Sequence, residues 1–392
     1  MSRVVIGLSG GVDSSVAAYL LKQQGHDLVA LFMVNWHERT GAITSACSWE
    51  EDAMIARMVA KKLDIPFHIV DLSKSYKKRV VDYMFAEYKA GRTPNPDILC
   101  NREIKFDTFL EEVNKFGAAY VATGHYCRKE ETTLHGETIY RLLAGKDKNK
   151  DQSYFLCQLN QEQLSQALFP IGHLTKPQVR QIAREQNLPT AERKDSQGIC
   201  FVGKVHLPAF LQQQLQPKTG NIIEIPASFM TKKKQLTPAE ENYHKTCFSF
   251  PFKPWNGKII GEHPGAHFYT IGQRKGLNLG GHKDPLFVIG TDVHRNIVYV
   301  GEGKEHPGLF RPGLFMSKND LHWIRPDMKM VPGEKKEYQI RIRYRQPTEK
   351  GLLHMTEDGT YILFEKEQRG ITSGQFAAWY LNDELIGSGI IT

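Results

Sequence analysis

The sequence feature that most constrains the fold is a strand that breaks at two glycines and restarts as a helix, in VIGLSGGVDSS (residues 5–15). Val4 to Leu8 has the length and β-branching of a buried strand. From Asp13, apolar residues recur with helical spacing until Gly25. Adjacent glycines let backbone N–H groups approach a ligand, and a helix N-terminus favours an anion. The stretch predicts a phosphate-binding loop; the alternative is a tight turn without a ligand.

This loop differs from the two common nucleotide-binding loops. A Walker loop carries a lysine for γ-phosphoryl transfer, whereas the nearest lysine here is Lys22, about two turns into the helix. The GxGxxG spacing of a dinucleotide site is also absent. SGGVDSS instead resembles the PP-loop of ATP pyrophosphatases, which hold the leaving pyrophosphate while ATP adenylates a substrate. The resemblance implies adenylation and leaves the substrate open, because these enzymes include amide-forming synthetases and tRNA-modifying enzymes.

The composition suits a multidomain protein with an anionic partner. A chain of 392 residues is long enough for two or three domains. Its 51 Lys and Arg against 43 Asp and Glu give a formal charge of +8, which suits nucleic acid without demanding it. The six cysteines include no C-x-x-C pair, so we expect neither a metal site nor a dense disulfide framework. Without a signal-like or membrane-spanning apolar run, we expect a soluble, cytoplasmic protein with no membrane partner.

The first half of the chain alternates strand-like and helix-like segments, which predicts an α/β domain with a doubly wound parallel sheet. Its ligand would lie outside the carboxyl ends of the strands, where the glycine loop lies. A capping box of Ser48 and Glu51 opens one helix. Further strands are expected at Leu28–Val34, Phe67–Leu72 and Ala118–Thr123, and helices at 48–63, Tyr76–Lys89, Gln161–Leu168 and Lys176–Gln186.

Past about residue 204, glycine and proline become frequent and short alternating segments replace the amphipathic ones, which predicts small β domains. These segments are Phe287–Asp292, Ile297–Val300, Tyr338–Tyr344 and Tyr361–Phe364. We therefore expect a catalytic domain at 1–204, a central β domain at 205–311 with a loop-rich insertion near 226–260, and a C-terminal, barrel-like β domain at 312–392.

A cysteine in GRTPNPDILCNREIKF (91–106) lies in a setting that suits chemistry. The two prolines impose an extended path, Asp97 precedes Cys100 by one turn, and a helix is expected to start near Asn101. A thiol near a helix N-terminus has a lowered pKa and is a better nucleophile. Taken alone, however, Cys100 is better explained as a buried core residue.

A second cysteine, Cys200, lies in a glycine-flanked loop in KDSQGICFVG (194–203), and alone it too would be explained as core. Together with SGGVDSS and the Cys100 stretch, it closely resembles the tRNA-specific 2-thiouridylases of the MnmA/TrmU type. The chain is longer than the bacterial pattern between Ile225 and Gly261. The similarity covers nearly the whole chain and continues in ATGHY, KDQSYFL, GQRKGL and RIRYRQ (122–126, 150–156, 272–277 and 341–346).

The resemblance implies ATP-dependent 2-thiolation of the wobble uridine of tRNA, giving 2-thiouridine, AMP and pyrophosphate. The uridine C2 oxygen leaves poorly, and adenylation by ATP, with Mg²⁺, would turn it into an oxygen of AMP. A persulfide on Cys200 would then attack C2, and Cys100 would resolve the link, leaving a Cys100–Cys200 disulfide. Asp97 is the implied general acid/base. A sulfur-relay protein would supply the persulfide.

The resemblance also implies a helical tRNA-binding part in the first domain and a set of binding residues. Met33 is equally well explained as strand core, an isolated histidine is usually structural, and a charged run is usually a solvated turn. The nucleotide site would comprise Gly7, Leu8, Ser9, Gly10, Gly11, Val12, Asp13 and Ser14, with Met33 and Gly124 beside the adenosine. The target base would meet Asn95, Pro96 and Asp97, and tRNA would meet His125, Lys150, Asp151, Gln152, Arg343, Tyr344 and Gln375.

The stretch YQIRIRYR (338–345) suggests RNA contact independently of the resemblance. In a strand, Arg341, Arg343 and Arg345 would share one face at spacings of about 6.6–6.8 Å. Three guanidinium groups in a row suit an RNA backbone. The alternative is an ordinary solvated face.

Two other functions remain open from the sequence. An amide-forming PP-loop synthetase would adenylate a carboxylate or a purine carbonyl, but it needs an ammonia source and leaves Cys100 and Cys200 without a role. A non-catalytic RNA-binding module would carry the loop as a vestige. Exchange of pyrophosphate into ATP, with and without tRNA, separates the three functions.

Overall fold

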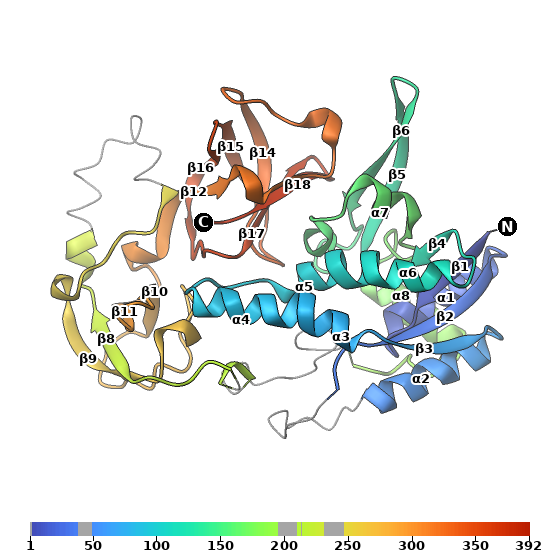
Figure 1. Ribbon diagram of the computed structural model, residues 1–392, viewed down its shortest axis with the longest axis horizontal. Coiled ribbons are helices and arrows are strands. Elements are labelled where there is room, and N and C mark those ends of the chain that lie inside the picture. The colour runs from blue at the N-terminus through green and yellow to red at the C-terminus, as the bar shows by residue number, and fades with distance from the viewer. Residues whose placement is uncertain (1, 38–48, 195–209, 213, 231–246) are drawn as a thin grey trace.

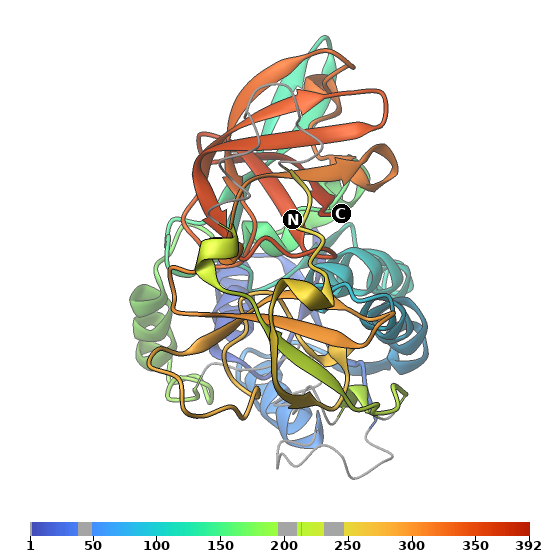
Figure 2. The ribbon, with the colours of Figure 1, turned by 90° about the vertical axis from the view of Figure 1, so that its left-hand side faces the viewer.

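The computed structural model describes residues 2–37, 49–194, 210–212, 214–230 and 247–392. The α/β part of the N-terminal half lies at one end of the long axis, and a small sheet of β8–β11 lies at the other end (Figure 1). A larger C-terminal sheet lies above the small sheet in the turned view (Figure 2). No helix among the described residues is long and apolar enough to cross a membrane.

The N-terminal half is built on a five-stranded sheet in which every neighbouring pair of strands is parallel. Strand β1 lies at its centre between β2 and β4, so the loop after β1 opens at the middle of the carboxyl edge. This confirms the expected parallel sheet. The order is β3-β2-β1-β4-β7, with bounds Phe67–Asp71, Asp27–Val34, Arg3–Gly7, Tyr120–Ala122 and Ala167–Leu168.

Helices cover both faces of this sheet. Side chains alternate along β1, so Val4 and Ile6 pack with α1, α2 and α8, whereas Val5 packs against the helices of residues 73–114. The first group is α1 (Val12–Gln23), α2 (Trp49–Lys62) and α8 (Lys176–Glu185). The second is α3 (Ser73–Tyr76), a π-helical stretch (Lys77–Val81), α4 (Asp82–Lys89), α5 (Pro96–Leu99), a second π-helical stretch (Cys100–Thr108) and α6 (Phe109–Asn114).

One expected helix end differs in the structure, and one expected helix cap lies outside the described residues. Helix α7 spans Gln161–Gln166, and the next two residues form β7, because they extend the parallel sheet beside β4. Ser48, the predicted cap of α2, lies outside the described residues.

Two β units follow, as expected. The small sheet has the order β10-β11-β8-β9, with bounds Leu286–Asp292, Ile297–Glu302, Gly220–Glu224 and Lys258–His263. Residues 231–246 of the expected insertion lie outside the described residues. The expected boundaries at 205 and 312 stay predictions. Short 3₁₀ helices occur at Ser153–Leu156, Pro254–Asn256, Ala266–Phe268, Pro307–Leu309, Lys318–Asp320 and Pro326–Met328.

The C-terminal sheet recruits a hairpin from the N-terminal half. Strands β5 (Cys127–Leu134) and β6 (Glu137–Ala144) extend it, because β6 pairs with β18. The sheet is thus shared between distant parts of the chain. Its order is β12-β16-β15-β14-β17-β18-β6-β5 with β13 on β18, and the remaining bounds are Phe310–Ser317, Gly359–Arg369, Glu349–Met355, Lys335–Arg341, Phe376–Leu381, Glu384–Ile390 and, for β13, Leu321–Trp323.

Candidate functional site

The glycine loop between β1 and α1 is braced by its own hydroxyl groups. The Ser9 backbone N–H donates to Ser14 Oγ at 3.2 Å, and the Ser15 hydroxyl donates to the Gly11 carbonyl at 2.8 Å. Gly10 has a φ of 72°, in the left-handed region that favours glycine. Gly11 is the N-cap of α1, so the first N–H groups of that helix face this loop. Such a loop can bind an anion.

Arg193 fixes the peptide that follows Gly10. Its Nη1 donates to the Gly10 carbonyl at 2.7 Å, and the same guanidinium pairs with Asp52 of α2. Because this peptide is trans, the Gly11 N–H points away from that carbonyl and its arginine. A Cβ on Gly10 would lie 2.6 Å from the Asp52 carbonyl oxygen, so no side chain fits there.

Asp13, in the first turn of α1, is bound by two groups that the sequence analysis did not single out. Lys176 Nζ lies 2.7 Å from Asp13 Oδ1 and 2.9 Å from Oδ2. The Tyr126 hydroxyl donates to Oδ1 at 2.7 Å. The side chains of Lys176 and Asp13 are 11% and 31% exposed, so the pair is largely shielded from water. A lysine at the start of a predicted helix, where a cation is unfavourable, was the available signal.

The two positions expected beside the adenosine lie against the same loop. A Cβ on Gly7 would lie 3.7 Å from Met33 Cε, and a Cβ on Gly124 would lie 2.6 Å from the Ser14 backbone nitrogen. Gly124 must therefore be glycine for its segment to approach α1 this closely. Met33 also packs in the apolar core, which agrees with the alternative explanation of this residue as strand core. The structure thus brings the predicted nucleotide positions together, while their contacts with ATP stay a prediction.

The residues predicted to meet the target base open α5. Asn95 is its N-cap and accepts a backbone N–H of the first turn at 3.3 Å, and Pro96 occupies the first helical position. The helix therefore starts at Pro96, and the expected start near Asn101 is wrong. Asp97 and Cys100 are three residues apart in this continuous helical stretch, so they share a face.

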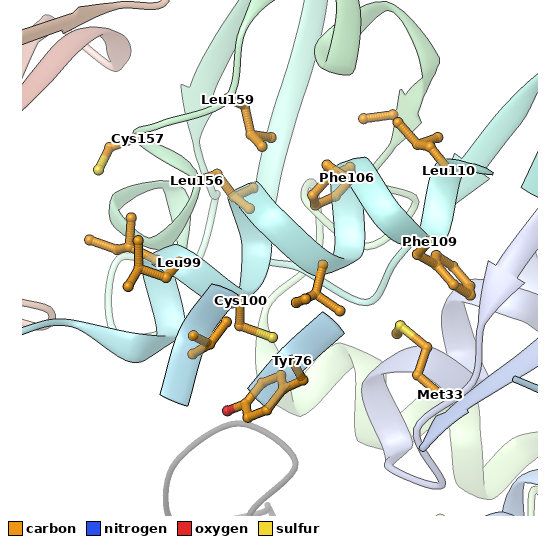
Figure 3. Close-up of a cluster of buried hydrophobic side chains, with 14 of the residues drawn as sticks. Met33, Tyr76, Leu99, Cys100, Phe106, Phe109, Leu110, Leu156, Cys157 and Leu159 are labelled. Atoms are coloured by element: carbon orange, nitrogen blue, oxygen red, sulfur yellow. The ribbon is translucent and has the colours of Figure 1, made fainter. Parts of the chain in front are cut away.

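Cys100 is fully buried, with 0% of its surface exposed. It begins the π-helical stretch and packs in an apolar cluster with Met33, Tyr76 and Leu156 (Figure 3). Because it lies beyond the first turn of the helical stretch, the helix N-terminus gives no reason for a reactive thiol here. The nucleophilic role of Cys100 thus rests on the resemblance alone. Cys200, its predicted partner, lies outside the described residues.

Three other described cysteines are poor candidates for sulfur chemistry. Burial raises the pKa of the Cys157 and Cys247 thiols to about 12. Burial, with the nearby Asp151 carboxylate, also raises the pKa of Cys127 well above its usual value. Because the thiolate is the nucleophile, these three thiols are unreactive near neutral pH.

Gln375 clamps the segment that precedes α5. Its Nε2 donates to the carbonyls of Thr93 and Pro94 at 2.9 and 3.1 Å, and its Oε1 accepts from Asn95 Nδ2 at 3.4 Å. The Thr93 hydroxyl also lies 3.1 Å from that of Thr270. Both β units therefore hold the predicted base-binding segment. The tRNA contact of Gln375 stays a prediction; in the structure this side chain orients Asn95.

The predicted tRNA-binding segment Lys150–Gln152 is largely internal. The Gln152 side chain accepts the Tyr126 backbone N–H at 3.0 Å, and Asp151 is 3% exposed. Asp151 Oδ1 accepts two backbone N–H groups, and Oδ2 accepts Arg341 Nη1 at 2.6 Å. Lys150 is partly exposed. Asp151 therefore acts as a structural link between the two halves of the chain, and contact of this segment with tRNA stays a prediction.

The expected row of three arginines on one strand face is wrong. Strand β14 ends at Arg341, and Arg345 has a φ of 63°, outside any strand conformation. The alternation breaks because Arg341 turns inward to the buried carboxylate of Asp151, while Arg343 donates to backbone carbonyls. Arg341 is therefore structural.

We accordingly expect Arg341→Met to reduce stability more than tRNA affinity. The substitution strands a carboxylate that is 1% exposed, which should lower the free energy of unfolding by about 3–5 kcal/mol. Lys350→Met is the control, because Lys350 pairs with Glu337 and Glu365 at the surface and should cost about 1 kcal/mol or less. Urea unfolding measures both. Unchanged stability with a smaller salt slope of tRNA binding would instead show that Arg341 faces RNA.

Arg343 and Gln375 line one hollow of about 330 Å³ together with residues 270–273. Tyr344 follows Arg343 in the sequence, and the centroid of its ring is 4.3 Å from that of Phe155. The hollow thus adjoins the segment that carries Asn95, because Gln375 lines the hollow and also hydrogen-bonds to that segment. The predicted RNA contacts of Arg343 and Tyr344 stay predictions.

His125 is 8% exposed and packs against the rings of Phe106 and Phe169. Its Nδ1 lies 2.8 Å from the Thr123 hydroxyl. Burial, with a smaller contribution from Lys105, holds the pKa of His125 well below its usual value of 6.5, so the ring is neutral. This buried environment agrees with the alternative explanation that His125 has a structural role, and contact of His125 with tRNA stays a prediction.

This buried histidine predicts a loss of stability at low pH. Below about pH 6.5 the unfolded chain takes up a proton that folded His125 does not, so stability is lost as pH falls towards the folded pKa. One such group contributes a slope of up to about 1.4 kcal/mol per pH unit. His125→Asn should remove this contribution to the pH dependence of the free energy of unfolding. His135→Asn, at the exposed hairpin tip, should leave that pH dependence unchanged. Urea unfolding between pH 7 and pH 5 tests this, and equal slopes in His125→Asn and wild type would contradict it.

The chain matches known domain families in three successive regions. Residues 2–204 match the tRNA methyl transferase HUP domain, residues 249–302 the tRNA methyl transferase PRC-barrel domain, and residues 315–391 the aminomethyltransferase β-barrel domain. The tRNA-specific 2-thiouridylase MnmA of Flavobacterium johnsoniae is 57% identical over 395 residues, which cover 100% of both chains. This chain belongs to the tRNA-specific 2-thiouridylase family.

More distant members of the tRNA-specific 2-thiouridylase family match over the same length. The protein of that name from Karelsulcia muelleri is 47% identical over 393 residues, covering 100% of this chain and 98% of the relative. A solved 4-thiouridine synthetase–RNA complex with bound ATP aligns at a TM-score of 0.32 and 17% identity, covering 54% of this chain and 50% of that chain. This similarity is too low to support a conclusion about fold or function. The resemblance expected from the motifs is confirmed.

Proposed function

We propose that this enzyme of the tRNA-specific 2-thiouridylase family adenylates the C2 oxygen of a wobble uridine with ATP and then replaces it with sulfur. One observation carries the proposal. Met33 would touch a Cβ built on Gly7, the residue of β1 that leads into the glycine loop, and it packs in the same apolar cluster as Cys100 (Figure 3). This shared core cluster supports a nucleotide site at the loop that works together with the thiol of Cys100.

The glycine loop fits the phosphates of ATP. Its helix N-terminus and serine hydroxyls supply donors, and the collision that a Cβ at Gly10 would make shows how closely the loop is confined. Asp13 has the carboxylate oxygens that Mg²⁺ prefers, but Lys176 and Tyr126 bind them in the structure, so Asp13 would have to release these partners to hold the ion. When bound, Mg²⁺ would neutralise charge on the phosphates.

The protein would position the base through the segment that Gln375 clamps. Asn95 is held both by its cap bond and by Gln375, so its amide is fixed before substrate arrives. Asp97, half-buried in the first turn of α5, would act as the general acid/base at the uridine while the C2 oxygen attacks the α-phosphate. The loop would retain pyrophosphate as it leaves.

Sulfur transfer would follow through the two cysteines. The terminal sulfur of a Cys200 persulfide attacks C2 and AMP leaves, which joins Cys200 to the base through an S–S bond. The Cys100 thiolate then attacks the Cys200 sulfur, the S–S bond to the base breaks, and the transferred sulfur stays on the base. A Cys100–Cys200 disulfide remains, which a reductant resets. Because Cys100 is fully buried, binding of tRNA would have to uncover it. A sulfur-relay protein would reload Cys200.

The test is exchange of labelled pyrophosphate into ATP with purified enzyme. Exchange should require tRNA with a wobble uridine and should be lost when the same tRNA carries a wobble cytidine. Exchange without tRNA would point instead to a synthetase acting on a small substrate. No exchange under any condition would favour an RNA-binding module. Mass analysis of tRNA from cells lacking this protein should show loss of 2-thiouridine.

A further inference from the structure

Three side chains of the kinds that bind metal ions converge at one edge of the small sheet. Glu224 and Glu302 are the last residues of β8 and β11, which are parallel neighbours, so both carboxylates lie at the same end of these strands. His282 comes from the loop of residues 269–285, which precedes β10. One ligand atom of each of the three residues lies within 4.8 Å of those of the other two. The expectation of no metal site came from the cysteine spacing, and this cluster contains no cysteine.

The two carboxylates continue apolar rows on the face of the sheet that this loop covers. Because side chains alternate along a strand, Glu224 lies on the same face of β8 as Ile222. On β11, Glu302 lies on the same face as Val300. These two apolar residues pack in one cluster with Leu277 of the loop. The loop therefore closes over the face that carries both carboxylates.

The two carboxylates lack a compensating lysine or arginine. Within the part of the chain that the structure describes, Glu224 Oε1 lies 4.0 Å from His282 Nδ1 and forms no ion pair with a lysine or arginine, and their side chains are 27% and 22% exposed. Glu302 Oε1 accepts the Asp284 backbone N–H at 2.8 Å, which orients this carboxylate. Two carboxylates this close repel each other, and a divalent cation between them would remove the repulsion.

We propose that Glu224, His282 and Glu302 bind one zinc ion, which fastens this loop to the ends of β8 and β11. An imidazole with two carboxylates suits zinc, whereas Mg²⁺ and Ca²⁺ take oxygen ligands, and water would complete a tetrahedral site. Zinc lies about 2.0–2.2 Å from such ligand atoms, so in a tetrahedral site they are about 3.5 Å apart and the cluster must close by about 1 Å. The loop has room to do so, because a Cβ on Gly280 or Gly281 would have nothing within 4 Å.

This inference goes beyond the proposed function and does not rest on it. The ion would be structural, because it restrains a loop. Gly272 and Gln273 of the same loop line the hollow together with Arg343. Zinc would therefore also restrain a segment that forms one wall of that hollow.

Calorimetric titration of zinc into the full-length protein, freed of metal with a chelator, tests the proposal. His282→Asn and Glu302→Gln should each bind zinc at this site about tenfold or more weakly, so wild type should hold one more zinc ion at low free zinc. Zinc held by thiols would appear equally in all the proteins and cancels in this difference. The matched controls are His294→Asn, at an exposed position of the β10–β11 turn, and Glu262→Gln, at an exposed position of β9, and both should bind zinc as wild type does.

Thermal melting provides a second measurement. Zinc should raise the melting temperature of wild type more than that of either variant, because a ligand that binds only the folded state stabilises it. Without zinc, all the proteins should melt near the same temperature, because the three side chains are only half-buried.

Three results would overturn the proposal. Equal zinc binding by wild type, His282→Asn and Glu302→Gln, or no zinc binding by wild type, would show that the cluster holds no ion. Magnesium or calcium bound at this cluster as tightly as zinc would reject the assignment to zinc. Variants that melt at a lower temperature without zinc, while zinc leaves the melting of wild type unchanged, would show that the three side chains only pack together.

Discussion

Replacing Cys200 with serine is expected to abolish thiolation of tRNA while adenylated tRNA still forms. A serine hydroxyl cannot carry sulfane sulfur, whereas adenylation requires only ATP, the glycine loop and a positioned base. Cys100→Ser is also expected to stop turnover, but with the persulfide retained on Cys200. Mass spectrometry of the tRNA and of the two cysteine-containing peptides distinguishes the two blocks. Cys157→Ser is the matched control, because its thiol is buried with a raised pKa and lies outside the proposed transfer.

The burial of Cys100 adds a second measurement to this prediction. A fully covered thiol should react slowly with an alkylating reagent in the free enzyme and faster when tRNA is bound. In wild type without a reductant, turnover should stall after one cycle with a Cys100–Cys200 disulfide. That bond requires the two Cα atoms to approach within about 7 Å. Full activity in either serine variant would reject the scheme, as would a stalled enzyme in which both cysteines remain alkylatable.

Gly10→Ala is expected to lower the rate of ATP-dependent exchange of pyrophosphate by about 100-fold while tRNA binding survives. The new Cβ would lie 2.6 Å from the Asp52 carbonyl and 3.0 Å from Arg193 Nη1, at a backbone φ of 72° that disfavours any side chain. The loop must therefore shift, and a displacement of about 1 Å can cost about 100-fold in rate. The readouts are pyrophosphate exchange and a filter-binding assay with tRNA.

A matched glycine separates collision from backbone strain. Gly136, at the β5–β6 hairpin, has a φ of 86° but nothing within 4 Å of a new Cβ. Gly136→Ala should thus show the strain of the left-handed region without a functional defect. Exchange by Gly10→Ala at the wild-type rate would mean that this loop does not hold the phosphates. Equal defects in both variants would mean that strain alone explains the result.

Local sequence sufficed to predict the glycine loop, the parallel sheet and the two β units. Strand and helix periodicities span a few residues, and Gly10 needs its backbone conformation whatever surrounds it, so both are visible in a short window. The start of α5 was also local: an asparagine cap followed by proline precedes Cys100, and giving those two residues more weight would have placed the helix correctly.

Only the tertiary structure decided which charged groups meet. Lys176 reaches Asp13 across 163 positions of sequence, and Arg341 reaches Asp151 across 190. No periodicity encodes such pairs, because they depend on how whole elements dock. The strand pattern predicts Arg341 on an exposed face, yet in the structure it turns inward to the buried carboxylate of Asp151. Likewise, β6 joins the C-terminal sheet through β18, since a sheet edge accepts any strand that the fold delivers to it.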